Sequence, residues 1–207
     1  MKLRTLLAAT AVALASQSAL ATAELLFLID GDTFTQPFSI TNQSTLSEQV
    51  TRFQLNIAPA SMVFDTVNGG VPNISNGVPF TPNGVSGTLT GLVPTFGPAD
   101  GASLLDISFT HFDSGEAFLW DIDIDGASGS PISVFGNQLI GSLATIDFSN
   151  GERLFGTLSA VGGRPQASQF LVTGRGITPT LPEPGSLALV GLALLAVGAA
   201  RRTAKRA

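Results

Sequence analysis

The stretches Leu104–Phe112, LLDISFTHF, and Ala117–Asp125, AFLWDIDID, decide the fold of this 207-residue chain. In the first, Leu105, Ile107 and Phe109 alternate with mostly polar side chains. In the second, large apolar side chains alternate with a leucine and three aspartates. Successive side chains of a strand point to opposite faces of its sheet, so each stretch predicts a strand with one buried face.

Further runs rich in Val, Ile, Leu, Phe and Thr lie on both sides of this pair, separated by Gly, Pro, Asn and Ser. This composition is typical of strands between turns. We therefore expect an all-β fold, a single antiparallel β-sandwich of jelly-roll or immunoglobulin-like type over residues 24–177. Long loops and one strand are expected in Asn68–Gly101. The further predicted strands are Leu25–Ile29, Thr35–Thr41, Thr51–Ala58, Ser86–Leu92, Gln138–Phe148, Arg153–Val161 and Gln169–Gly174.

The charge and the cysteine count exclude several classes of function. Between Glu24 and Leu181 the chain holds fourteen acidic residues and four arginines, a formal charge of −10. An acidic domain repels phosphate backbones, so we expect no nucleic-acid partner. The chain has no Cys, which excludes disulfides, thiolate metal sites and a cysteine nucleophile.

The N-terminal segment has the layout of a secretory signal peptide. Lys2 and Arg4 precede the apolar run Leu6–Ala15, which is too short for a comfortable membrane span. We assign residues 1–23 to this signal and expect signal peptidase to cut after Ala21 or Ala23. Small residues stand where the peptidase reads the chain, at Ala19, Ala21 and Ala23.

The C-terminal segment has three parts in a fixed order. Residues 178–185 form a Pro-rich linker that contains Pro182, Glu183 and Pro184. Residues 186–207 are predicted as a short transmembrane helix with a basic tail that stays cytoplasmic. The apolar part of that segment is Leu187–Ala200, and the basic stop-transfer residues are Arg201, Arg202, Lys205 and Arg206.

This three-part tail resembles the PEP-CTERM sorting domain, over about 25 residues. The resemblance implies recognition by an exosortase, an integral-membrane cysteine transpeptidase, and processing near Pro182, Glu183 and Pro184. It also implies an exported protein of a bacterium that makes exopolysaccharide. Such a protein would be anchored transiently in the inner membrane and then displayed on the cell surface or secreted.

Asp121, Asp123 and Asp125, followed by Gly126, match the opening of a D-x-D-x-D-G calcium loop. The twelfth position of that loop is Ile132 rather than a bidentate glutamate. On a straight strand the outer two carboxylates would be ~13 Å apart, too far to share one ion. We therefore expect a solvated acidic strand face, with calcium bound by two of these aspartates as the alternative and no other cofactor.

No set of residues indicates an enzyme. His111 is the single His and shares its predicted strand face with Leu105, Ile107 and Phe109, so we expect a rim or core residue. The single Trp, Trp120, alternates into the core. We expect a structural or interaction protein of the cell surface or the exopolysaccharide (biofilm) matrix. The alternatives are a calcium-assisted carbohydrate-binding module and, with less support, a secreted glycoside hydrolase built on a carboxylate pair.

Overall fold

The computed structural model describes residues 22–45, 47–72, 76–94, 97–130 and 133–174. These residues belong to the first of two compact units, Met1–Ile177; the second unit is Thr178–Ala207. The described residues form antiparallel sheets with very little helix, which confirms the prediction of an all-β fold. The jelly-roll or immunoglobulin-like topology and the four domain limits stay predictions.

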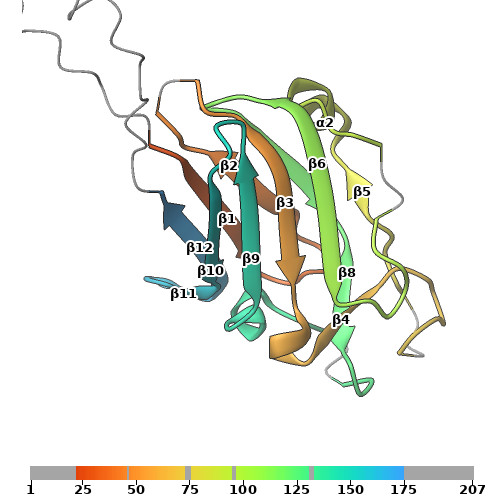
Figure 1. The fold of residues 1–207 in the computed structure, drawn as a ribbon. Helices are drawn as coiled ribbons and strands as arrows, with labels where there is room; N and C mark the ends of the chain where they lie inside the picture. The colour runs from red at the N-terminus through yellow and green to blue at the C-terminus, as the bar shows by residue number, and fades with distance from the viewer. Residues whose placement is uncertain (1–21, 46, 73–75, 95–96, 131–132, 175–207) are drawn as a thin grey trace, which may run out of the picture. The chain divides into compact units, whose positions relative to one another are not determined.

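Two larger sheets make up most of this unit. The strands of the first are β1 (Glu24–Asp30), β2 (Phe38–Asn42), β5 (Thr81–Pro82), β7 (Ala117–Asp121), β11 (Ser159–Val161) and β12 (Arg164–Thr173). The strands of the second are β3 (Val50–Asn56), β6 (Leu104–Phe112), β9 (Leu143–Phe148) and β10 (Arg153–Thr157). The six-stranded sheet has the order β11-β12-β1-β2-β7-β5, and the four-stranded sheet has the order β10-β9-β3-β6. Figure 1 shows β9, β3 and β6 side by side.

Aromatic side chains join the two sheets through a shared core. Phe27 on β1 stacks on Phe53 on β3 with ring centroids 5.8 Å apart. Trp120 on β7 is 0% exposed and stacks on Phe38 and Phe118 of its own sheet at 5.5 and 5.4 Å. Trp120 also contacts Phe53 across the core at 6.0 Å. Offset aromatic packing of this kind adds to the hydrophobic term, and the expected core position of Trp120 is confirmed.

A third, two-stranded sheet pairs β4 (Met62–Asp65) with β8 (Asp123–Gly126). The single strand predicted over Ala117–Asp125 is wrong, because the chain changes partner at Ile122. Its first part is β7, and its second part leaves that sheet to pair with β4. Alternation continues through the break, so the sequence pattern alone gives no sign of it.

The strand predicted over Ser86–Leu92 is also wrong, because this segment begins in the helix α2 (Gly84–Leu89). The Asn83 side chain caps it by accepting a hydrogen bond from the Ser86 amide at 3.1 Å, and such a cap favours a helix over the β-propensity of Val and Thr. The described residues also include the 3-10 turns η1 (Ala58–Ala60) and η2 (Gly136–Leu139). The second one occupies the start of the strand predicted over Gln138–Phe148.

His111 lies on the exposed face of β6 near its end, with its Nδ1 2.9 Å from Thr110 Oγ1. The expectation that it shares the face of Leu105, Ile107 and Phe109 is wrong. The pairing of β3 with β6 shifts between Val50 and Arg52. Phe112 and Ser108, four positions apart on β6, pair with Val50 and Arg52, two positions apart on β3, so the pairing between them is irregular. The alternation is broken in this stretch, and Phe112 rather than His111 is the next buried residue after Phe109. The rim position itself is confirmed.

Among the described residues, no helix is both long enough and apolar enough to cross a bilayer. The transmembrane helix predicted over 186–207, with its basic tail, lies outside the described residues. So do Pro182, Glu183 and Pro184, and most of the predicted signal peptide, including Ala19 and Ala21. Ala23 is described and is 0% exposed.

Candidate functional site

Three buried aspartates from two strands bring their carboxylates together. Asp65 ends β4, whereas Asp123 and Asp125 both lie on β8. Each offers one oxygen, and these oxygens all lie within 4.8 Å of one another. Asp65 and Asp125 are 0% exposed, and Asp123 is 5% exposed. We call these three residues the aspartate cluster.

The cluster differs from the sequence-based hypothesis in one residue and in its environment. Asp123 and Asp125 are brought together, but Asp121 ends β7, is exposed and is not part of the group. The expected solvated acidic face is therefore wrong for Asp123 and Asp125, because β8 leaves the sheet of β7 and is covered. Asp65 takes the third place.

Strand register accounts for the meeting of these residues. Antiparallel pairing of β4 with β8 sets Asp65 directly opposite Asp123, and Phe64 opposite Ile124. Phe64 and Ile124 are both 0% exposed and belong to the hydrophobic core. Since neighbouring side chains of a strand point to opposite faces, the core contact of this pair places Asp65, Asp123 and Asp125 together on the other face.

The segment after β4 passes close to this acidic face. The Val78 amide donates to the Asp65 carbonyl at 3.0 Å, and the Asp123 amide donates to the Val78 carbonyl at 3.1 Å. Gly77, the preceding residue, packs against the Asp65 side chain, because a Cβ built there would lie 2.4 Å from Asp65 Oδ1. Because glycine has no side chain, position 77 leaves room for the Asp65 carboxylate.

The carboxylates of the cluster are unusually short of partners. Both oxygens of Asp65 and both of Asp125 are buried without a hydrogen-bond partner in the described structure. Burial, followed by the neighbouring Asp65, raises the pKa of Asp125 to about 7. Burial and the charge of Asp125 raise the pKa of Asp123 to about 7, and burial also raises the pKa of Asp65. Three such groups stay buried at neutral pH only with bound protons or a bound cation.

Asp100 shows how a neighbouring acid in the same region is satisfied. Its Oδ1 accepts the amides of Thr66 and Val67 at 2.8 and 3.1 Å, and its Oδ2 accepts the amide of Val71 at 2.5 Å. Burial alone would raise the pKa of Asp100, but these three donors lower it. Asp100 therefore fixes the loop that follows Asp65, and the aspartate cluster has no equivalent set of donors.

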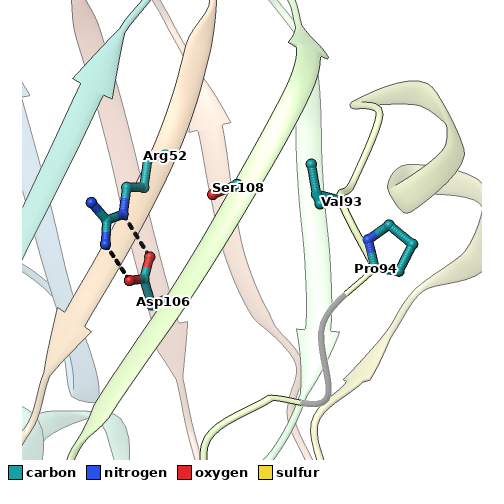
Figure 2. A pocket seen from close by; sticks show the side chains of 5 residues that line it. All are labelled: Arg52, Val93, Pro94, Asp106 and Ser108. Atoms are coloured by element: carbon teal, nitrogen blue, oxygen red, sulfur yellow. Dashed lines mark hydrogen bonds and ion pairs between the residues drawn. The ribbon is translucent and has the colours of Figure 1, made fainter.

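A surface depression of about 430 Å³ lies beside β3 and β6 (Figure 2). Arg52 pairs with Asp106 across these strands through Nε to Oδ1 at 2.8 Å and through a second, shorter contact. Gln54 also donates to Asp106 at 3.0 Å. The remaining lining residues are Val93, Pro94 and Ser108. Because its charged groups neutralise each other, this open hollow offers no free charge to a ligand.

The comparison with known families identifies a sorting signal near the C-terminus. The model of the PEP-CTERM protein-sorting motif matches residues 180–202. The chain is a PEP-CTERM sorting domain-containing protein. The matched range includes Pro182, Glu183 and Pro184, and it indicates an exported protein that an exosortase processes at the cell surface. No curated protein and no solved structure matches the chain.

Sequence reasoning missed one member of the aspartate cluster of this PEP-CTERM protein. Asp65 ends a strand of four residues, and nothing in Met62–Asp65 marks it as a partner of Asp123 and Asp125. One signal was available. Asp65 follows the apolar residues Val63 and Phe64. A buried strand predicted over these residues would have placed a buried acid at its end.

Proposed function

We propose that this PEP-CTERM protein is a structural or interaction component of the exopolysaccharide matrix outside the cell, and that its β domain performs no catalysis. The observation that carries the proposal is the sorting motif at residues 180–202. A protein that exosortase processing delivers to the cell surface is in a position to contact extracellular polysaccharide. A compact all-β domain is suited to that setting because it buries a continuous core without disulfides.

The charge of the domain supports an extracellular, non-nucleic-acid role. The described residues hold fourteen acidic residues but only three arginines, a formal difference of −11. Each arginine is paired with its own aspartate, Arg52 with Asp106, Arg153 with Asp147 and Arg164 with Asp30. The surface is therefore anionic, which favours solubility and contact with cations in an anionic matrix.

The outer face of the four-stranded sheet supports binding to polysaccharide as a second candidate function. Phe155 on β10 is 66% exposed, and Leu143 on β9 is 47% exposed. They line a shallow depression of about 310 Å³ together with Thr145 and Thr157. An exposed aromatic ring beside hydroxyl groups is a suitable platform for a sugar ring.

The delivery half of the proposal is tested in a bacterium that contains an exosortase. The wild-type protein is compared with a variant in which Pro182, Glu183 and Pro184 are all replaced by Ala. Mass spectrometry of the extracellular fraction should find wild-type protein that has lost its tail near these residues, whereas the variant should be retained in the membrane fraction. A secreted wild-type protein that still ends at Ala207 would contradict the proposal.

The matrix half is tested separately by co-sedimentation of the purified protein with exopolysaccharide from the same bacterium. We expect the wild-type protein to co-sediment and the Phe155→Ala variant to bind at least several-fold more weakly. Exposed Val85 on α2 gives a matched control, because Val85→Ala removes a surface apolar group away from this face. Equal loss in both variants, or no co-sedimentation of the wild type, would contradict polysaccharide binding.

A further inference from the structure

We infer that the aspartate cluster, Asp65 with Asp123 and Asp125, is a calcium-binding site that holds β4 and β8 together in the exported protein. This inference is independent of the matrix role proposed above. It uses a different third residue from the D-x-D-x-D-G pattern of the sequence. Its basis is the arrangement of three carboxylates, their lack of partners and the positions of the basic residues.

The distances within the cluster are those of oxygens around one ion. Calcium binds oxygens at ~2.4 Å, so two ligands on opposite sides of it are at most ~4.8 Å apart. The three oxygens offered by Asp65, Asp123 and Asp125 lie within 4.8 Å of one another. These separations do not exceed the width of the coordination sphere of a single ion, unlike the separation of the outer two aspartates in a row on one straight strand.

The burial of unpartnered oxygens points to a missing ligand. Asp65 and Asp125 are fully buried, and within the described part of the chain none of their four carboxylate oxygens makes a hydrogen bond of standard geometry. The polar groups that act on the pKa of Asp65 are the Val67 amide and the carboxylates of Asp125 and Asp100. Buried carboxylates are paired, hydrogen-bonded or bound to metal, because an isolated buried charge is very unfavourable. Asp100, in the same region, accepts three amides, so the local backbone does supply donors where they are needed.

No basic side chain of the described residues is available to neutralise the cluster. These residues include no Lys, and their three arginines pair with other aspartates, as set out above. His111 on β6 has its Nδ1 next to Thr110 Oγ1. Asp32 adds a further negative charge near Asp123. The compensating charge therefore has to come from solution.

The donor set selects the type of cation. All the ligands are hard carboxylate oxygens, which favour calcium or magnesium over zinc or copper. Magnesium keeps several of its waters and usually binds through one or two carboxylates, whereas three buried carboxylates converge here. Calcium accepts bidentate carboxylates and irregular geometry, and the remaining positions can be filled by main-chain carbonyls or water.

Calcium binding to the folded chain has a measurable consequence for stability. A ligand that binds only the folded state raises its stability by an amount that depends on its concentration relative to Kd. For the full chain, purified and freed of metal with a chelator, CaCl₂ at about 100 times Kd should raise Tm by about 5–10 °C. Isothermal titration calorimetry with CaCl₂ should give one site per chain, and MgCl₂ should give a smaller shift in Tm.

Two matched substitutions locate the site. Asp125→Asn keeps the shape of the side chain, removes a charge and should abolish the calcium-dependent rise in Tm. Asp121→Asn changes the exposed aspartate of the same sequence pattern and should keep the full rise. If Asp125→Asn does not fold, Asp65→Asn and native mass spectrometry of the calcium-loaded wild type replace it.

Two results would overturn the inference. One is a wild-type chain that gives neither binding heat nor a Tm shift at 10 mM CaCl₂, because the carboxylates would then be satisfied by protons. The other is a calcium response that survives Asp125→Asn but is lost in Asp121→Asn, because the ion would then bind at the exposed row.

Discussion

Replacing Asn42 by Ala should strongly destabilise the domain, because this side chain joins the two sheets. Asn42 is the last residue of β2 and is 0% exposed. Its Nδ2 donates to the carbonyls of Glu48 and Phe112, both at 2.9 Å, and its Oδ1 accepts the amide of Ser44 at 3.1 Å. Phe112 belongs to β6, so one of these bonds crosses from the six-stranded to the four-stranded sheet.

The magnitude follows from three lost hydrogen bonds. Each contributes about 1 kcal/mol net, and a buried group left without a partner costs at least as much, so Asn42→Ala should lower the free energy of unfolding by about 3 kcal/mol. For a domain of this size that corresponds to a fall in Tm of about 6–12 °C. Asn42→Asp should be at least as damaging at pH 7, because its carboxylate would face two carbonyl oxygens.

Urea unfolding followed by fluorescence is a suitable assay for this prediction. The chain has one Trp and no Tyr, and Trp120 is buried, so its emission reports the core without interference. Asn56→Ala is the matched control. Asn56 lies on the outer side of β3 and accepts only the Ala58 amide in a local turn, at 3.0 Å, so its loss should cost under about 1 kcal/mol. An Asn42→Ala variant within about 1 kcal/mol of the wild type would refute the reasoning.

Three further predictions concern packing, pH and the loop beside the aspartate cluster. Gly156→Ala should lower Tm by several degrees, because its Cβ would lie 2.0 Å from the ring of buried Phe170; an unchanged Tm would contradict this packing. Without calcium, the raised pKa values of Asp123 and Asp125, both about 7, mean that the folded chain holds more protons than the unfolded chain above pH 4. Stability in chelator should therefore fall as pH rises from about 4 to 7, by up to about 1.4 kcal/mol per pH unit for each group; urea midpoints that rise with pH would contradict it. Asp100→Ala removes the acceptor of three amides and should lower stability by about 2–3 kcal/mol in urea, whereas Asp100→Asn, which keeps one acceptor oxygen, should lose less.

The parts of the fold that sequence could predict are those governed by local alternation. The strand predicted over Leu104–Phe112 coincides with β6, and the burial of Trp120 follows from the same pattern. Alternation depends on one strand and one core face, so it holds where a strand stays in one sheet and its pairing is regular. Alternation does not reveal the change of sheet at Ile122, because the apolar and polar residues keep alternating when the chain leaves one partner strand for another.

The parts that could not be predicted depend on contacts between distant segments. The irregularity that exposes His111 lies in the pairing of β3 with β6, and the pairing of β4 with β8 brings Asp65 to Asp123. Register between strands far apart in the chain is not encoded in either strand alone. The helix α2 is different, since Asn83 is a standard helix-capping residue that could have been recognised before the Val and Thr that follow it.

The contacts of Thr22 and Ala23 favour one of the two signal peptidase sites that the sequence predicts. Ala23 is fully buried in the hydrophobic core, and its carbonyl accepts the amide of Gly174, just beyond β12, at 2.6 Å. Thr22 exchanges two hydrogen bonds with Thr45, from its own amide to Oγ1 at 2.8 Å and from the Thr45 amide to its carbonyl at 2.9 Å. Cleavage after Ala23 would remove all three bonds and one core side chain, whereas cleavage after Ala21 keeps them.

We therefore expect the exported protein to begin at Thr22. N-terminal sequencing of the protein recovered outside the cell tests this directly, and a sequence that begins at Glu24 would contradict it. An Ala19→Phe variant provides the control, because a large residue at position 19 disrupts the Ala19-x-Ala21 site, leaves the Ala21-x-Ala23 site intact and changes no described contact of the domain. If processing then moves to Ala23, the shortened protein should have a lower Tm than the wild type, since it has lost the Ala23 and Thr22 contacts that close β1 against its neighbours.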